Sequence, residues 1–271
     1  STLLASSAAS DVYKRQVVFL APDETGHITP AALEEALTAD TILLSCQLVN
    51  NEIGTVQPVA ELGTLLKAKA PGALFHIDAV QGLCRVPLTP KKWNCDLMSV
   101  SGHKIGAPKG IGALYVKKGL RLPPLMFGGG QEKGMRPGTE PLPNIAAFAK
   151  ACAIRMSHFD EDYAHVAELA AYLKEQAAAN LPDAAFNGEG DVPHVVNLSI
   201  PGCKSEVMLR VLEGDEVYVS SGSACSKGRQ SGVLRALGLP KARTDSAIRV
   251  SFAPFNTKED VDAFIAAAQK G

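Results

Sequence analysis

The sequence predicts an α/β fold, because short apolar runs alternate along the chain with segments of helical periodicity. The runs at 41–46, 73–77 and 97–101 have the length and composition of buried strands. Alternation of strands and helices is typical of a sheet with helices on both faces. The hydrophobic fraction of 46% in 271 residues supplies enough apolar side chains for one large domain or two smaller ones.

The first half of the chain supplies the larger predicted sheet. Thr29 is the expected N-cap of the first helix, with Pro30 at its first helical position. A second helix is expected at 58–70, because Val59, Leu62, Leu65 and Leu66 share one helical face. In chain order, the strand candidates are 17–20, 41–46, 73–77, 97–101 and 111–116, the last being a candidate hairpin partner of the one before it.

The second half predicts a smaller α+β unit. A loop rich in Gly and Pro at 128–143 leads into two Ala-rich helices, and a capping box of Thr257 and Asp260 begins the last helix. We place a domain boundary near residue 158, which gives a partial large domain at 17–158 and a small domain at 159–271. Residues 1–16 match neither pattern and are expected to be disordered or non-native. The remaining candidates are helices at 144–158, 162–180 and 205–213 and strands at 194–200, 217–220 and 247–252.

Composition excludes several classes of protein. The net charge of −1 gives no basic field for nucleic acid or an anionic membrane surface, and no apolar run reaches the roughly 18 residues of a membrane span. The six cysteines include no C-x-x-C pair, so we expect no zinc site and interpret them as reduced thiols of a cytoplasmic protein.

Polar residues follow the strand candidate at 97–101. Ser101, His103 and Lys104 stand where this strand gives way to a loop of Gly and Pro. Ligands of α/β sheets bind at such strand ends, where a partly desolvated lysine has a lowered pKa and can form a Schiff base. Ser101 and His103 offer donors suited to a phosphate. A solvated surface lysine is the alternative interpretation.

Two further strand ends carry polar groups. Asp78 ends the apolar run at 73–77, where a carboxylate can keep a pyridinium nitrogen protonated, and Gln81 can donate to a ring hydroxyl. Asn51 follows the strand at 41–46. A helix N-cap or turn aspartate and an Asn-rich turn are the alternatives. Three such ends together favour a site for pyridoxal 5′-phosphate (PLP).

Six segments together resemble the signature segments of cysteine desulfurases, which are class V aminotransferase-like enzymes of PLP fold type I. The resemblance runs in order from about Val17 to the end of the chain. It implies an incomplete large domain with a mixed, mostly parallel sheet and a smaller α+β C-terminal domain. The segments are VNNEIGTVQP, HIDAVQG, SGHKIGAPKGIGALY, GGGQEKGMRPGTEP, SSGSACS and AIRVSF.

The resemblance assigns a role to each matching residue. Lys104 holds PLP covalently and serves as general base, assisted by His103, while Asp78 pairs with the pyridine nitrogen and Gln81 contacts the ring hydroxyl. Arg249 binds the substrate carboxylate, a task that suits a planar guanidinium; a surface arginine is the alternative. The resemblance further places Ser101 and His103 on the PLP phosphate, Asn51 beside cofactor and substrate carboxylate, and Thr139 on the phosphate of a partner subunit. Pro137 stands where many relatives have Ser.

Cys225 lies in a run of small residues, SSGSACS, which is typical of a mobile loop. The matching loop of the family carries the nucleophile that takes sulfur from L-cysteine as a persulfide, with L-alanine as the other product. This form of the loop resembles the branch that passes sulfur to an acceptor protein, either an iron–sulfur scaffold or a thiolation protein. The other five cysteines lie in or beside apolar elements and read as packing thiols.

Two elements that the resemblance implies ahead of the NNEIG segment are not visible: a phosphate-binding loop with Gly and Thr, and a histidine that stacks on PLP. We therefore expect an N-terminally truncated chain. Two alternatives remain open. One is a selenocysteine lyase or another class V PLP enzyme; the other is an inactive fragment or pseudoenzyme that only binds a partner. The thiol of Cys225 argues against an aminotransferase, which needs none.

Overall fold

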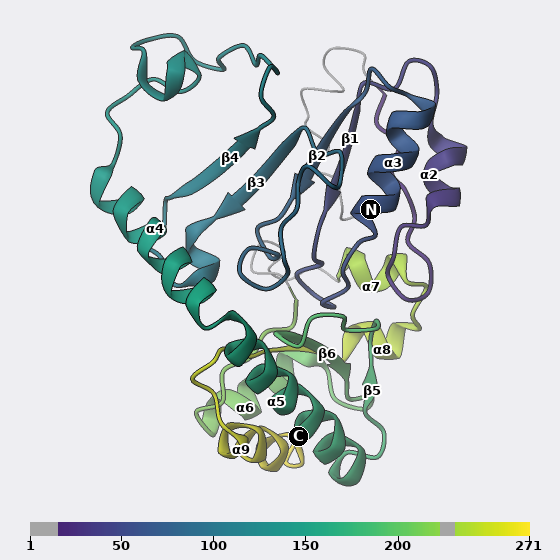
Figure 1. The fold of residues 1–271 in the computed structure, drawn as a ribbon. Coiled ribbons are helices and arrows are strands. Elements are labelled where there is room, and N and C mark those ends of the chain that lie inside the picture. Colours follow the sequence, from purple (N-terminus) through teal and green to yellow (C-terminus); the bar gives the residue numbers. More distant parts are fainter. Residues whose placement is uncertain (1–15, 223–230) are drawn as a thin grey trace.

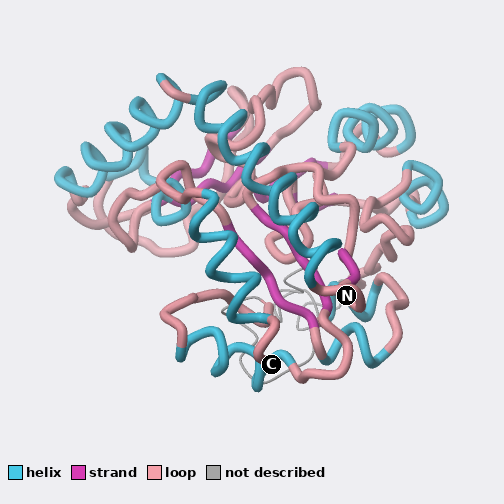
Figure 2. Tube along the Cα trace, turned by 90° about the horizontal axis from the view of Figure 1, so that it is seen from below, coloured by secondary structure: helices cyan, strands magenta, loops and turns pink. Residues whose placement is uncertain are grey.

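The computed structural model describes residues 16–222 and 231–271, which contain a four-stranded and a three-stranded sheet. The large sheet lies in the upper part of Figure 1 and the small sheet in the lower part. Helix α4 (Leu142–Ser157) runs along the left of the large sheet, and α5 (Phe159–Asn180) runs across the lower part. The view from below shows helices flanking the strands (Figure 2). In these ranges no helix is both long and apolar enough to cross a membrane.

The large sheet is mixed and mostly parallel, as the resemblance implies. Strands β1, β2 and β3 are parallel, and β4 is antiparallel to β3, which confirms the hairpin partner expected at 111–116. The strand order is β1-β2-β3-β4. The strands are β1 (Leu43–Gln47), β2 (Leu74–Asp78), β3 (Leu97–Ser101) and β4 (Gly112–Val116).

Helices α2 (Pro30–Ala36) and α3 (Val59–Lys69) lie together beside this sheet (Figure 1). The Thr29 side chain accepts the Ala32 N–H at 3.1 Å, which confirms the predicted N-cap. Gly63 lets α3 approach closely, because a Cβ there would lie 2.0 Å from the Trp93 carbonyl oxygen. The core of this half includes four fully buried side chains, those of Leu62, Leu66, Phe75 and Ile77.

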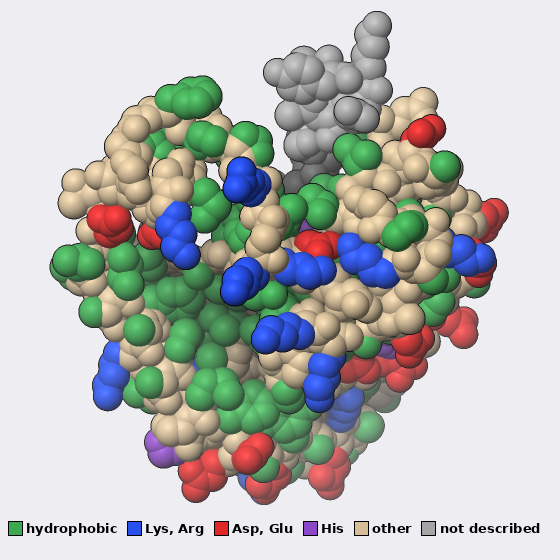
Figure 3. Space-filling model, turned by 45° about the horizontal axis from the view of Figure 1, so that its top comes forward, with side chains coloured by type: hydrophobic (Ala, Val, Ile, Leu, Met, Phe, Trp, Pro, Cys, Tyr) green, Lys and Arg blue, Asp and Glu red, His purple; other side chains and the backbone are tan. Residues whose placement is uncertain are grey.

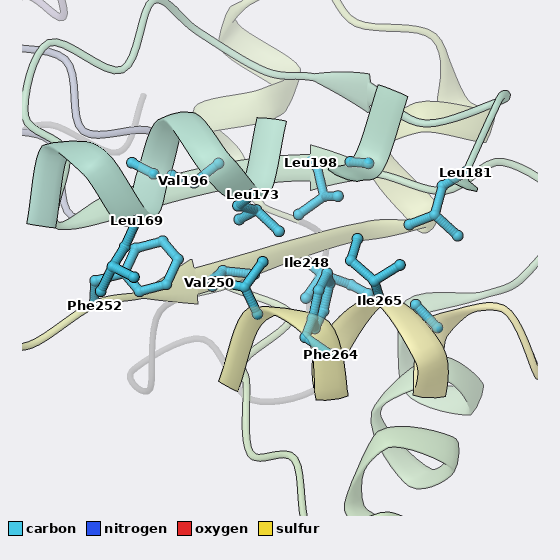
Figure 4. Packing of buried hydrophobic residues seen from close by; sticks show 14 of the residues in the cluster. Leu169, Leu173, Leu181, Val196, Leu198, Ile248, Val250, Phe252, Phe264 and Ile265 are labelled. Carbon is cyan, nitrogen blue, oxygen red and sulfur yellow. The ribbon is translucent and has the colours of Figure 1, made fainter. Parts of the chain in front are cut away.

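The small sheet has the order β5-β6-β7, with both pairs antiparallel. Its apolar residues point toward those of α5 and α9, so that Leu173, Leu198, Ile248 and Phe264 meet in one core (Figure 4). The predicted capping box of Thr257 and Asp260 is present. The elements are β5 (Ala185–Phe186), β6 (Val195–Ser199), β7 (Ala247–Ser251), α4 (Leu142–Ser157), α5 (Phe159–Asn180), α6 (Ser205–Gly214) and α9 (Lys258–Ala268).

The structure corrects some expected elements. Residues 17–20 form no strand: Val18 is 60% exposed, and no neighbouring strand pairs with this segment in the described ranges. The strand expected at 217–220 reduces to one bridge between Ser220 and Arg249. Short helices α7 (Gly232–Ala236) and α8 (Lys241–Asp245) were not predicted, since five residues are too few for a helical period. The boundary near residue 158 stays a proposal; it falls between α4 and α5.

A buried carboxylate ties the last turns of α3 to the large sheet. Asp96 is 4% exposed, and its oxygens accept from Lys67 Nζ at 2.6 Å, Lys117 Nζ at 3.0 Å and the Phe75 N–H at 3.0 Å. Burial alone raises the pKa of Asp96, but these hydrogen bonds outweigh burial and hold the pKa below its ordinary value. A lowered folded-state pKa stabilises the fold above the unfolded-state pKa, and this contribution disappears as pH falls through the folded-state pKa.

Replacing Asp96 by asparagine is expected to lower the free energy of unfolding by about 2 kcal/mol at pH 7, because two lysines lose their charged partner. The loss should shrink below about pH 3.9, where the unfolded carboxylate is protonated. Urea unfolding at pH 7 and at pH 3 measures both effects, with the exposed Asp40→Asn as control. An equal loss at both pH values contradicts the assignment.

Candidate active site

The predicted polar groups gather at the carboxyl edge of the large sheet. Asp78 is the last residue of β2 and Ser101 the last of β3, and these strands are adjacent and parallel. Lys104 follows Ser101 in the short 3-10 helix η1 (Gly102–Ile105). The carboxylate, the hydroxyl and the amine therefore come from neighbouring strand ends, where α/β sheets bind their ligands.

Asp78 presents its carboxylate to solvent at this edge. One oxygen, Oδ1, accepts the Val80 N–H at 2.9 Å, and the Asp78 carbonyl oxygen accepts the Leu48 N–H at 2.7 Å. The backbone and one carboxylate oxygen are thus fixed by the turn that follows β2. This geometry holds the carboxylate in one orientation at the strand end.

The turn after β3 sets the position of Lys104. Gly106 ends η1 at φ 90°, a left-handed conformation that favours glycine. The Ser101 hydroxyl and His103 Nδ1 lie 2.7 Å apart, so the two residues proposed for the phosphate form one hydrogen-bonded pair. His103 is exposed and Lys104 is partly buried.

A row of polar side chains beneath Asp78 was missed by the sequence analysis. His76 lies between Ser45 of β1 and Ser99 of β3, with Nδ1 2.8 Å from the Ser45 hydroxyl and Nε2 2.9 Å from the Ser99 hydroxyl. Burial lowers the pKa of His76, although the charge of Asp78 opposes the shift. Alternation along β2 places His76 on the same face as Asp78, and this was the available signal.

The small sheet brings Arg249 of β7 to the NNEIG segment. Arg249 Nη1 donates to the Asn51 carbonyl oxygen at 3.0 Å, which unites two residues predicted for the substrate carboxylate. Burial lowers the pKa of Arg249, and the nearby charge of Glu52 partly offsets this. Arg249 Nε is buried without a hydrogen-bond partner in the described part of the chain.

Glu52 is a second residue that the sequence analysis missed. It is 2% exposed, and its Oε2 accepts a hydrogen bond from the Ser231 hydroxyl, which also caps α7 through the Leu234 N–H. A Cβ on Gly222 would lie 3.9 Å from the same oxygen. Cys225 lies outside the described residues, but the described residues before and after its segment, Gly222 and Ser231, both lie near Glu52.

Two predicted residues lie in other surroundings. Gln81 Oε1 accepts a hydrogen bond from Arg85 Nη1, so its carbonyl is engaged within the chain. Thr139 is exposed on the long connection between β4 and α4. Because β4 runs antiparallel to β3, this connection leaves from the opposite end of the sheet (Figure 1), and Thr139 does not join Lys104 and Asp78 in this chain.

The residues at the sheet edge fit PLP. The exposed carboxylate at the end of β2 suits the pyridine nitrogen, and the lysine after β3 suits the aldehyde. The hydroxyl–imidazole pair beside that lysine suits the phosphate. Across 16–222 and 231–271, no group of His, Cys, Asp or Glu side chains has the arrangement of a metal site.

Comparison with known families gives one family match. The model of the family described as aminotransferase class-V matches residues 1–264. A cysteine desulfurase from Nostoc sp. is 38% identical over 92% of this chain, and a cysteine desulfurase IscS from Clostridium botulinum is 38% identical over 91%. The chain spans 63% of the length of these curated relatives.

Solved structures give the same picture of the fold. A NifS-like protein superposes with a TM-score of 0.89 at 31% identity, over 96% of this chain and 69% of that one. A NifS-like protein from Rickettsia africae superposes with a TM-score of 0.87 at 30% identity, over 97% of this chain and 71% of that one. These similarities confirm the fold type inferred from the six sequence segments.

Proposed function

The chain belongs to the aminotransferase class-V family, and from this premise we propose that the whole protein is a PLP-dependent cysteine desulfurase. The proposed reaction converts L-cysteine to L-alanine and leaves the sulfur on Cys225 as a persulfide. The observation that carries the proposal is the placement of Lys104 and Asp78 on adjacent strand ends, with Arg249 held against Asn51. The 38% identity to proteins named cysteine desulfurase supports the same reaction.

In this proposal five side chains hold the cofactor. Lys104 would bind it covalently, Asp78 would hold a proton on the pyridine nitrogen and Gln81 would contact the ring hydroxyl. Ser101 and His103 bind the phosphate as the pair seen 2.7 Å apart. PLP, when bound, accepts the negative charge that develops at the substrate α-carbon.

The substrate carboxylate is assigned to Arg249 and Asn51. The contact from Arg249 Nη1 to the Asn51 carbonyl leaves the rest of the guanidinium for a charge-assisted pair. Lys104 would serve as the general base that moves the α-proton, and His103 would assist this transfer.

Sulfur transfer is assigned to Cys225. Its thiolate attacks the sulfur of the substrate, so that an S–S bond forms while the Cβ–S bond breaks. The carbon fragment keeps the electron pair of the broken bond and leaves as L-alanine after protonation. The persulfide then passes to an acceptor protein, either an iron–sulfur scaffold or a thiolation protein.

A homodimer forms part of the proposal. The connection that carries Thr139, together with β4 and α4, bears exposed apolar side chains including Leu114, Phe127 and Leu142, and Figure 3 shows hydrophobic side chains gathered on this side. An exposed apolar surface of this kind is typical of an interface. A second copy would bring Thr139 to the partner's phosphate. A cytoplasmic location, proposed from the cysteine pattern, suits the reduced thiol that the reaction needs.

The test is a single-turnover reaction of the whole protein with L-cysteine and PLP, measuring alanine and the persulfide on Cys225. We expect equal amounts of both products, because each turnover makes one of each. Binding of PLP with formation of neither product would make another class V reaction the better assignment. Faster turnover of selenocysteine, with no dependence on Cys225, would favour selenocysteine lyase.

A further inference from the structure

A cavity lies where η1 and the turn after β2 meet α4, α5 and the ends of β6 and β7. Its volume is about 60 Å³, and since a water molecule needs roughly 10–15 Å³ on this measure, a ligand of a few heavy atoms fits. A second, more open depression shares Arg85, Phe159 and Tyr163 with it. The side chains that decide its chemistry are Arg85, Lys104, Arg155, Asp162, Tyr163 and His194.

The cavity carries more basic than acidic groups. Arg85 is partly buried and donates to Gln81 Oε1, and no carboxylate of the described ranges lies within ion-pair distance of it. Arg155 lies 3.3 Å from Asp162 Oδ2, the single acidic side chain among the described lining residues. A partly buried guanidinium without a counter-charge is costly, because desolvation is not offset by an ion pair.

The lowered pKa values of two lining groups agree with this excess of basic over acidic groups. Burial, with the charges of Arg155 and Arg249, lowers the pKa of Arg85 to about 10. Burial, with the charges of Arg85 and Arg155, lowers the pKa of His194 to about 4. His194 is 8% exposed, its ring packs edge-on against Tyr163, and its Nδ1 has no hydrogen-bond partner among the described residues. Burial is the larger cause of both shifts, and the positive charges of neighbouring arginines add to it.

We propose that the cavity binds a small oxyanion between Arg85 and Arg155. Guanidinium groups bind carboxylates and inorganic oxyanions by the same charge-assisted hydrogen bonds, and an anion would relieve the repulsion among the arginines. Neither the phosphate pair of Ser101 and His103 nor Arg249 lines this cavity. It borders Lys104, so an anion bound there changes the electrostatic surroundings of that amine. The proposal does not depend on the sulfur chemistry.

The test follows His194 by NMR in the PLP-loaded whole protein, so that the cofactor fills its own phosphate site. Acetate, phosphate and chloride are titrated separately at constant ionic strength. We expect acetate or phosphate, but not chloride, to raise the pKa of His194, since a bound anion cancels the charge of the arginines. Acetate alone would identify a carboxylate site, and phosphate alone a site for tetrahedral oxyanions.

Two variants locate the effect. Arg85→Gln is expected to weaken oxyanion binding at least tenfold, whereas Arg121→Gln, at an exposed arginine, leaves it unchanged. Arg85→Lys keeps the positive charge but loses the planar guanidinium, so its oxyanion affinity should fall between those of the Arg85→Gln and Arg121→Gln variants. It replaces Arg85→Gln in the test if that variant does not fold. A His194 pKa that responds to no oxyanion, or an equal loss in the Arg121 variant, overturns the proposal.

Discussion

The Lys104→Ala variant of the whole protein is expected to lose alanine formation by about 10³-fold or more. Lys104 has two assigned tasks: it holds the cofactor covalently, and it moves the α-proton. General-base catalysis alone contributes about 10²–10⁴-fold. Lys104 stands in η1 directly after β3 and is partly buried, whereas Lys109, in the same connection to β4, is exposed. Single-turnover alanine release measures the loss.

The absorption spectrum separates this prediction from simple unfolding. The visible band of lysine-bound cofactor should vanish in Lys104→Ala, while the thermal unfolding temperature changes little because Lys104 is only partly buried. Lys118→Ala, at an exposed lysine, is the matched control and should keep both band and activity. A variant without Lys104 that still forms alanine at the normal rate would show that another base acts.

The sequence predicted those parts of the fold that periodicity controls. Strand β3 has the predicted bounds, and the Thr29 cap and the Thr257–Asp260 box appear as expected, because capping is a local interaction. Residues 17–20 have the composition of a strand but pair with no neighbouring strand in the described ranges, and a strand forms only when its backbone hydrogen-bonds to another strand. The two-residue β5 is defined only by pairing with β6. These failures share one cause, since pairing is not encoded within the strand itself.

The candidate site was predictable where its residues stand at strand ends. Asp78, Ser101 and Lys104 fall there, so parallel pairing alone brings them together. Glu52 and Ser231 are 179 residues apart, and no local pattern connects them. The Ser45–His76–Ser99 row likewise requires the register of three strands. Contacts between distant segments are set by tertiary packing, which the pattern of one segment does not report.

Replacing Cys225 by serine is expected to abolish the persulfide and to reduce alanine release roughly hundredfold or more. A serine hydroxyl stays protonated near neutral pH and is a poor nucleophile toward sulfur, whereas a thiolate is a good one. Burial raises the thiol pKa of Cys46 to about 12 and those of Cys84 and Cys95 to about 11, which leaves these thiols unsuited to replace it. Mass spectrometry of the alkylated Cys225 peptide detects the persulfide.

The cofactor band distinguishes this variant from Lys104→Ala. Cys225→Ser should keep the band of lysine-bound PLP and its shift on adding L-cysteine, because only the step at sulfur is removed. Cys203→Ser is the matched control, since Cys203 is partly exposed and carries no role in the proposed reaction. If Cys225→Ser still releases alanine at the normal rate, sulfur leaves without an enzyme thiol. The selenocysteine lyase assignment then becomes the better one, because that chemistry does not depend on Cys225.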